Sequence, residues 1–174
     1  MQGASYRFAF ARRERGKSER SQLSLGVGHH RGCCVTEEKG AWALIALETD
    51  DGPRIYRIRS GPPAGVEKEI FDENVIIEWK FGEGLPDQAT SAAMFALQEL
   101  LEPLDDHTKH SLLVHVYTGS GIKEWCYYTK NYDDFMEGLN VALRGKPRFP
   151  IEILHDRDPA WTYWNHIKDY ANGK

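Results

Sequence analysis

A few side chains could do acid–base or nucleophilic chemistry if the fold brought them together. Cys126 could act as a nucleophile beside His115, and Glu78 could pair with Glu152 as a general acid and base. All four lie in predicted strands, where a cysteine is usually an inert small hydrophobe and a carboxylate is usually just solvated. We therefore expect no catalytic residue, and a hidden enzyme site around Glu78, His115 and Cys126 is the alternative.

Two segments contain the ligand types of a metal site. His107 and His110 lie in a predicted loop beside two aspartates, and His29-His30 precedes Cys33-Cys34. Nothing marks a closed site around the first pair, and the second group lies in a segment without periodicity. The chain also lacks a phosphate-binding loop, a Gly-x-Ser-x-Gly elbow and a His-Glu-x-x-His helix. We expect a protein without a metal or cofactor.

The elements that must position these residues run from Asn74 to His155. Hydrophobic pattern and punctuation predict the order strand, helix, strand, hairpin turn, strand, helix, strand. This is the βαββαβ order of a ferredoxin-like α+β sandwich. The predicted strands are 75–79, 112–118, 123–129 and 151–154, and the predicted helices open at Pro86-Asp87 and at Asp133 or Asp134.

Two more elements flank this unit. Residues 42–47 and 54–59 are predicted strands around Asp50-Asp51-Gly52, which is a strong hairpin signal. Downstream, Asp158-Pro159 is typical of an N-cap followed by proline at the first helical position. Tryptophans at 161 and 164 should then dock a short terminal helix on the sandwich. The predicted fold class is thus a two-layer α+β sandwich with an N-terminal β-hairpin and a short C-terminal helix.

The turn after Thr118 decides which side chains share a face of the sheet. With a three-residue turn, Leu112, Val114 and Val116 point toward the helices, and the open face carries the candidate binding residues. These are His115, Tyr117, Lys123, Trp125 and Tyr127, with Glu78 from the first strand of the unit. A two-residue turn shifts the pairing by one residue and places His115 opposite Cys126.

This candidate face has two interpretations. It could be an amphipathic aromatic platform for a partner, or it could be a second small core covered by the terminal helix or the first hairpin. The second is favoured because Trp161 and Trp164 need an apolar surface to pack against.

A basic head precedes the predicted domain. Residues 1–34 hold seven Lys or Arg and two Glu, a charge of about +5, and the remainder holds 15 basic and 24 acidic residues, about −9. The head lacks periodic apolar residues, so we expect 1–40 to be a disordered tail, or an extension from an upstream start codon, and 41–170 to be a single α+β domain. Arg12-Arg13 resembles the start of a twin-arginine signal, but no apolar region follows it. An Arg-rich presequence is kept as the alternative.

Composition limits the class and location of the protein. The 174 residues are 41% hydrophobic, which is enough for a core, and no run approaches the roughly 18 apolar residues of a membrane span. Three cysteines cannot all pair, and Cys33 and Cys34 are adjacent, so we expect no disulfide framework. These features predict a cytoplasmic protein that does not bind a membrane.

RNA-recognition domains share the βαββαβ order and stack bases on aromatic residues of their central strands. Here the strand from Ile122 to Thr129 lacks their basic-Gly-aromatic-Gly pattern. The negative charge of the folded part also opposes attraction to phosphates. Nucleic acid binding through the sheet is therefore not expected, and single-stranded RNA binding is kept as an alternative.

A succession of aromatic motifs provides a resemblance. Lys123-Glu124-Trp125-Cys126-Tyr127-Tyr128 is followed by Tyr132-Asp133-Asp134-Phe135 and then by Asp158-Pro159-Ala160-Trp161. Over roughly residues 42–165, the chain resembles the uncharacterised bacterial family catalogued as domain of unknown function 695. It is similar, more distantly, to the regulator of ribonuclease E activity B, which inhibits an endoribonuclease by binding it.

Neither resemblance implies catalytic residues, and the second implies action through protein contacts. We therefore expect a non-enzymatic binding or regulatory module whose partner is another protein. The sequence leaves the oligomeric state open.

Overall fold

The computed structural model of the protein describes residues 40–171. The predicted basic tail therefore lies outside the described residues, apart from Gly40. The elements are β1 (Trp42–Thr49), β2 (Gly52–Arg59), β3 (Glu73–Lys80), α1 (Gln88–Leu101), a 3₁₀ turn (Glu102–Leu104), β4 (Ser111–Gly119), β5 (Ile122–Thr129), α2 (Tyr132–Leu143), β6 (Ile151–Arg157) and α3 (Thr162–Ala171). The predicted α+β class is confirmed.

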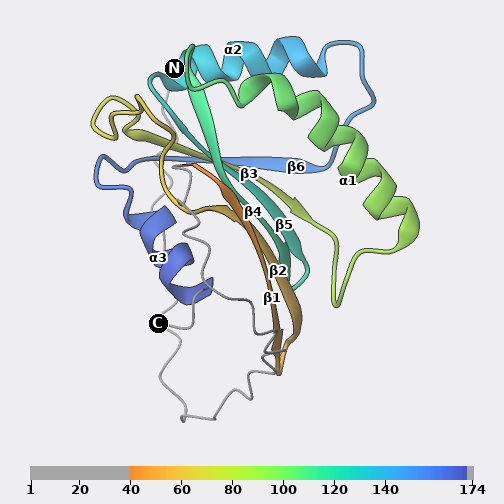
Figure 1. Cartoon of the computed structure of the whole chain (residues 1–174). Coiled ribbons are helices and arrows are strands. Elements are labelled where there is room, and N and C mark those ends of the chain that lie inside the picture. Colours follow the sequence, from red (N-terminus) through yellow and green to blue (C-terminus); the bar gives the residue numbers. More distant parts are fainter. Residues whose placement is uncertain (1–39, 172–174) are drawn as a thin grey trace, which may run out of the picture. The chain divides into compact units, whose positions relative to one another are not determined.

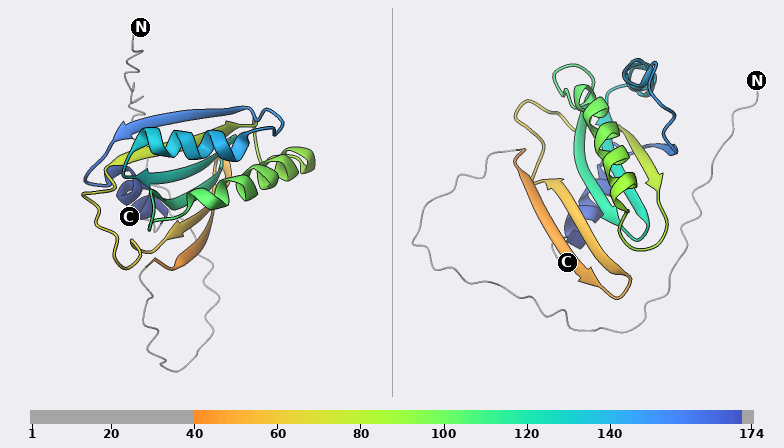
Figure 2. Two further views of the ribbon diagram at one scale, coloured as in Figure 1. Left: turned by 90° about the horizontal axis from the view of Figure 1, so that it is seen from above. Right: turned by 90° about the vertical axis from the view of Figure 1, so that its right-hand side faces the viewer.

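All six strands belong to one antiparallel sheet, in the order β1-β2-β4-β5-β3-β6. The first hairpin extends the sheet, because β2 pairs with β4. Helices α1 and α2 lie over one face of the sheet, and α3 lies against the other (Figure 1). The views of Figure 2 show that β1 and β2 project beyond the part that α1 and α2 cover.

The central strands are apolar on both faces because helices cover both faces. In β3, Val75 and Ile77 face the core beneath α1 and α2, whereas Ile76 faces the core beneath α3. A strand buried on both sides appears in the sequence as a continuous apolar run rather than as an alternation. This explains the unbroken Val75-Ile76-Ile77 segment.

The helices begin where side chains cap them, and two predicted starts were wrong. At α1, Asp87 accepts a hydrogen bond from the Thr90 N–H at 2.7 Å, as predicted. At α2 the cap is Asn131, whose side chain accepts from the backbone of Asp134 at 3.0 Å. Asp133 and Asp134 lie instead in the first turn, where their negative charges stabilise the helix by interacting with the positive end of its dipole.

The terminal helix starts later than Asp158-Pro159 predicted. Helix α3 begins at Thr162, and the Asp158 carboxylate accepts from the N–H groups of Thr162 and Tyr163 at 2.8 and 2.9 Å. Trp161, just before the helix, has a φ of 54° and stacks on Tyr128 with ring centroids 4.3 Å apart. The predicted docking through Trp161 and Trp164 is confirmed, since both are fully buried.

Within residues 40–171, no helix is long and apolar enough to cross a membrane.

Candidate functional site

The β4–β5 turn has two residues, so the register that pairs His115 with Cys126 is the one that forms. Ser120 and Gly121 both have positive φ, 50° and 79°, as a primed two-residue turn requires. A Cβ atom on Gly121 would overlap the backbone carbonyl of Gly82, so only glycine fits there. The pairing expected for a three-residue turn, with Tyr117 opposite Lys123, was wrong: Tyr117 faces Glu124.

The six candidate binding residues do not share a face. Trp125 and Tyr127 are fully buried in the core beneath α1 and α2, and the Lys123 ammonium lies 5.0 Å from the centre of the Trp125 ring. His115 and Tyr117 lie on the opposite face, beneath α3. Glu78 is also on that face. It pairs with Glu124 of β5, and Glu124 accepts a hydrogen bond from the Tyr163 hydroxyl of α3.

A β-bulge explains why the expected alternation along β4 was wrong. The register shifts between Leu113 and His115, so two residues of β4, Val114 and His115, lie opposite one residue of β5, Cys126. Leu112 and Val114, which were expected to face α1 and α2, lie in the core beneath α3. Val116 returns to the core beneath α1 and α2, as expected.

A small polar cluster is enclosed beneath α3. His115 is fully buried, and neither ring nitrogen has a hydrogen-bond partner. Its Nε2 is 3.9 Å from Glu124 Oε2, which accepts a hydrogen bond from the Tyr163 hydroxyl at 3.2 Å. Burial, and then the Glu124 charge, raise the pKa of Tyr163. His115 itself has no exposed surface, whereas Glu124 and Tyr163 reach the edge of the cluster, so a substrate could not contact the imidazole directly.

The proposed acid–base pair and nucleophile are also engaged within the fold. Lys80 contacts Glu78 at 3.1 Å and Glu152 at 2.7 Å, so both carboxylates share one ammonium as their ion-pair partner. Cys126 is fully buried, and the Asn74 amide lies 3.1 Å from its sulfur. Burial raises the pKa of the Cys126 thiol, which disfavours the nucleophilic thiolate.

Among residues 40–171, no group of three or more His, Cys, Asp or Glu could hold a metal ion. The other candidate ligand group, at residues 29–34, lies outside the described part of the chain.

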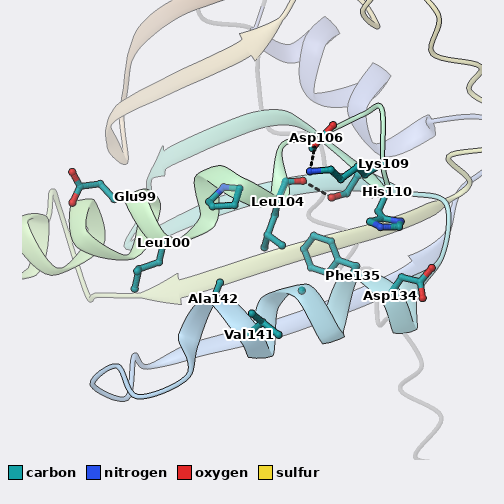
Figure 3. Close-up of a pocket in the computed structure, with 13 residues that line it drawn as sticks. Glu99, Leu100, Leu104, Asp106, Lys109, His110, Asp134, Phe135, Val141 and Ala142 are labelled. Carbon is teal, nitrogen blue, oxygen red and sulfur yellow. Dashed lines mark hydrogen bonds and ion pairs between the residues drawn. The ribbon is translucent and has the colours of Figure 1, made fainter.

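A pocket of about 430 Å³ opens between the end of α1 and α2 (Figure 3). Its apolar lining includes the buried side chains of Leu104 and Phe135 and the exposed side chain of Val141. At the rim, Lys109 pairs with Asp106 at 2.9 Å, and hydrogen bonds from Thr108 and Lys109 lower the pKa of that carboxyl. The volume suits a small ligand, but the polar groups lie along the rim and do not converge on a reacting atom.

An exposed surface lies on β1 and β2, on the face of the sheet that α1 and α2 cover elsewhere. We call it the β1–β2 patch, and its residues form three cross-strand pairs, which are Trp42 with Arg59, Leu44 with Arg57, and Ala46 with Ile55. Leu44 is 76% exposed. The guanidinium carbons of Arg57 and Arg59 lie 4.3 and 4.4 Å from the centre of the Trp42 ring. The patch therefore combines aliphatic, aromatic and cationic groups on a regular strand pair.

One side chain of the patch, Arg59, is anchored by a hydrogen bond and an ion pair to the neighbouring part of the fold. Arg59 donates to the Leu113 carbonyl at 2.8 Å and pairs with Asp105 at 2.8 Å. Asp105 also accepts from the Leu113 N–H at 2.9 Å, at the start of the β4 bulge. Sequence analysis missed this surface. Its signal is the continuous apolar run from Trp42 to Leu47, which places apolar side chains on both faces of the first strand of a hairpin that no helix follows directly.

The comparisons with known proteins identify one relationship. The model of the family of unknown function DUF695 matches residues 40–167, so the chain belongs to this family. This confirms the first resemblance, whereas the more distant one, to the regulator of ribonuclease E activity B, is not shown. No curated protein and no solved structure matches the chain.

Proposed function

We propose that this member of the DUF695 family is a non-enzymatic protein-binding module that contacts its partner through the β1–β2 patch. The observation that carries this proposal is the exposure of Leu44 beside the Trp42 ring with its two arginines. Interface energy concentrates in a few aromatic and arginine side chains surrounded by apolar contacts. The aromatic residues of β5 are buried in the two cores and offer no such surface.

The burial of the β5 aromatics also favours a protein partner over single-stranded RNA. Bases would have to stack on the faces of central-strand rings, which here pack against helices. An enzyme is disfavoured for a related reason: His115 and Cys126 have no exposed surface. A cytoplasmic location is part of the proposal, and the support for it is the cysteine usage of the sequence.

The finer fold assignment is also a proposal. We propose that β3 to β6 form a ferredoxin-like sandwich to which the β1–β2 hairpin adds two strands. The support is the βαββαβ element order together with the strand order β4-β5-β3-β6, in which every neighbouring pair is antiparallel.

Affinity capture with paired variants tests the function. The full chain, Leu44→Glu and Phe95→Glu would each be used as bait in native extract, and bound proteins would be identified by mass spectrometry. Phe95 is a matched control because it is a large apolar residue, 60% exposed, on α1. We expect a protein that the wild type and Phe95→Glu capture and Leu44→Glu loses. Identical capture by all three would overturn the role of the patch.

A further inference from the structure

The two edges of the sheet differ in how open they are to another strand. The β6 edge carries Glu152, Asp156 and Arg157, and proline residues precede and follow it. Strand β1 has eight residues, Trp-Ala-Leu-Ile-Ala-Leu-Glu-Thr, with no lysine, arginine or proline. Charge and proline are the usual devices that protect an edge from pairing. The β6 edge has both, whereas the one charged residue of β1 is Glu48, near the end of the strand.

The outward backbone groups of β1 can be assigned from its pairing with β2. The Ser60 N–H donates to the Ala41 carbonyl at 2.8 Å, which makes this pair a hydrogen-bonded pair of the ladder. Such pairs alternate along an antiparallel ladder, so the odd-numbered residues of β1 bond to β2. Pro53, which has no N–H, accordingly lies opposite the even-numbered Glu48. Trp42, Leu44, Ala46 and Glu48 therefore direct their N–H and C=O groups outward, and β2 is the only described strand that pairs with β1.

The side chains of β1 are complementary to those of a second, antiparallel β1. With Ile45 on the two-fold axis, Leu44 lies opposite Ala46 on one face, and Ala43 lies opposite Leu47 on the other. In these pairs a large side chain meets a small one, and at the axis Ile45 meets Ile45 of the second copy. The outward backbone groups of Leu44 and Ala46 meet in the same register, so about eight backbone hydrogen bonds can form across the axis.

Charge complementarity points to the same occupant. In this register Glu48 of one copy lies opposite Trp42 of the other, on the same face of the joined sheet. The Trp42 ring lies beneath the guanidinium groups of Arg57 and Arg59. The carboxylate of Glu48 therefore approaches the exposed Arg57, whereas Arg59 is already paired with Asp105, and this contact is made twice in a symmetric pair.

We infer that β1 pairs with β1 of a second copy of this chain, so that one antiparallel sheet continues through a symmetric dimer. This inference rests on the proposed function, in that it names the partner at the β1 edge. The β1–β2 patches of the two copies become neighbours on one face of the joined sheet and leave Leu44 accessible to a further protein.

Sedimentation velocity of the purified full chain tests this inference. The matched variants are Ala46→Lys on β1 and Ala96→Lys on α1, because both replace an exposed alanine with the same charge. We expect a dimer for the wild type and Ala96→Lys, and a dissociation constant raised at least about tenfold for Ala46→Lys. Glu48→Arg should weaken the dimer as well. Circular dichroism would establish that each variant is folded.

Hydrogen exchange on the wild type supplies a second measurement that needs no variant. The outward amides of Leu44, Ala46 and Glu48 should become protected as protein concentration rises. A wild type that stays monomeric with these amides unprotected, or a dimer that survives Ala46→Lys, would overturn the inference. If the wild type forms no dimer but still captures another protein, and Leu44→Glu abolishes that capture, this inference alone is overturned and the proposed function stands.

Discussion

Replacing Trp125 with alanine tests whether the β5 aromatics form a core or a binding surface. Trp125 is fully buried beneath α1 and α2, with Val116 and Ile77 as its cross-strand neighbours. Its indole N–H is 3.4 Å from Gln98 Oε1, which is a weak hydrogen bond, so the loss comes mainly from burial and packing. Truncating a buried tryptophan to alanine costs about 3–5 kcal/mol, and we expect that range here.

Urea unfolding measures this loss directly, and a thermal melt provides a check. For a chain of this size, each kcal/mol lowers the Tm by about 2–4 °C, so Trp125→Ala should melt roughly 6–20 °C below the wild type. Phe95→Ala is the control, because Phe95 is 60% exposed and should cost less than about 0.5 kcal/mol. A Trp125 cost as small as that of Phe95 would mean that the side chain is not in the core. The register of the β4–β5 hairpin would then be wrong.

Three further predictions concern the second helix, the terminal helix and the thiol. Leu139→Ala should cost about 2–5 kcal/mol in urea unfolding because Leu139 is buried, whereas Arg144→Ala should cost less than about 0.5 kcal/mol, and equal costs would contradict the helix phase. Asp158→Ala should cost about 0.5–2 kcal/mol at neutral pH by removing the cap of α3, and thermal melts should show this difference fading in acid. Cys126 should react with a thiol reagent in urea but not in native buffer when the two head cysteines are replaced by serine, and labelling of the folded protein would contradict its burial.

The sign of the acid prediction follows from the surroundings of Asp158. Burial would raise its pKa, but hydrogen bonds from the Tyr128 hydroxyl and from the backbones of Thr162 and Tyr163 outweigh burial and lower it. A folded pKa below the unfolded value, about 3.9, means that the carboxylate stabilises the fold above that pH. This stabilisation is lost as the pH falls through the lower folded pKa.

Local signals in the sequence predicted most of the elements. Glycine, proline and β-branched runs placed all six strands and three helices near their observed positions. The errors at α2 and α3 are of two or three residues. The error at α2 arises because several capping residues compete, and α3 starts late because Trp161, just before it, has a positive φ. Asn131, Asp133 and Asp134 can all cap a helix, and only the extended backbone at Asn131 makes it the residue that does.

The faces of the sheet could not be predicted as well as the strands. Gly119-Ser120-Gly121 is compatible with a two-residue or a three-residue turn, and in the two-residue turn that forms, Gly121 lies against the backbone of Gly82 from another loop. The β4 bulge then reverses the phase of Leu112 and Val114 relative to Val116. Both features depend on residues distant in sequence. They divided the six candidate residues between the two faces of the sheet.

This division changes where a function can reside. The aromatic residues of β5 allowed either an exposed platform or a second core, and the core was favoured; in the structure α1 and α2 cover Trp125 and Tyr127, and Trp161 stacks on Tyr128. Helices α1 and α2 do not extend over β1 and β2 (Figure 2). In the described part of the chain, those strands therefore retain an uncovered face, and β1 has a free edge. The apolar run of β1 from Trp42 to Leu47, which contains no charge and no proline, would be a liability in a strand without a partner. A strand that keeps these features, with Trp42 and two arginines beside it, is better explained by a partner that covers it.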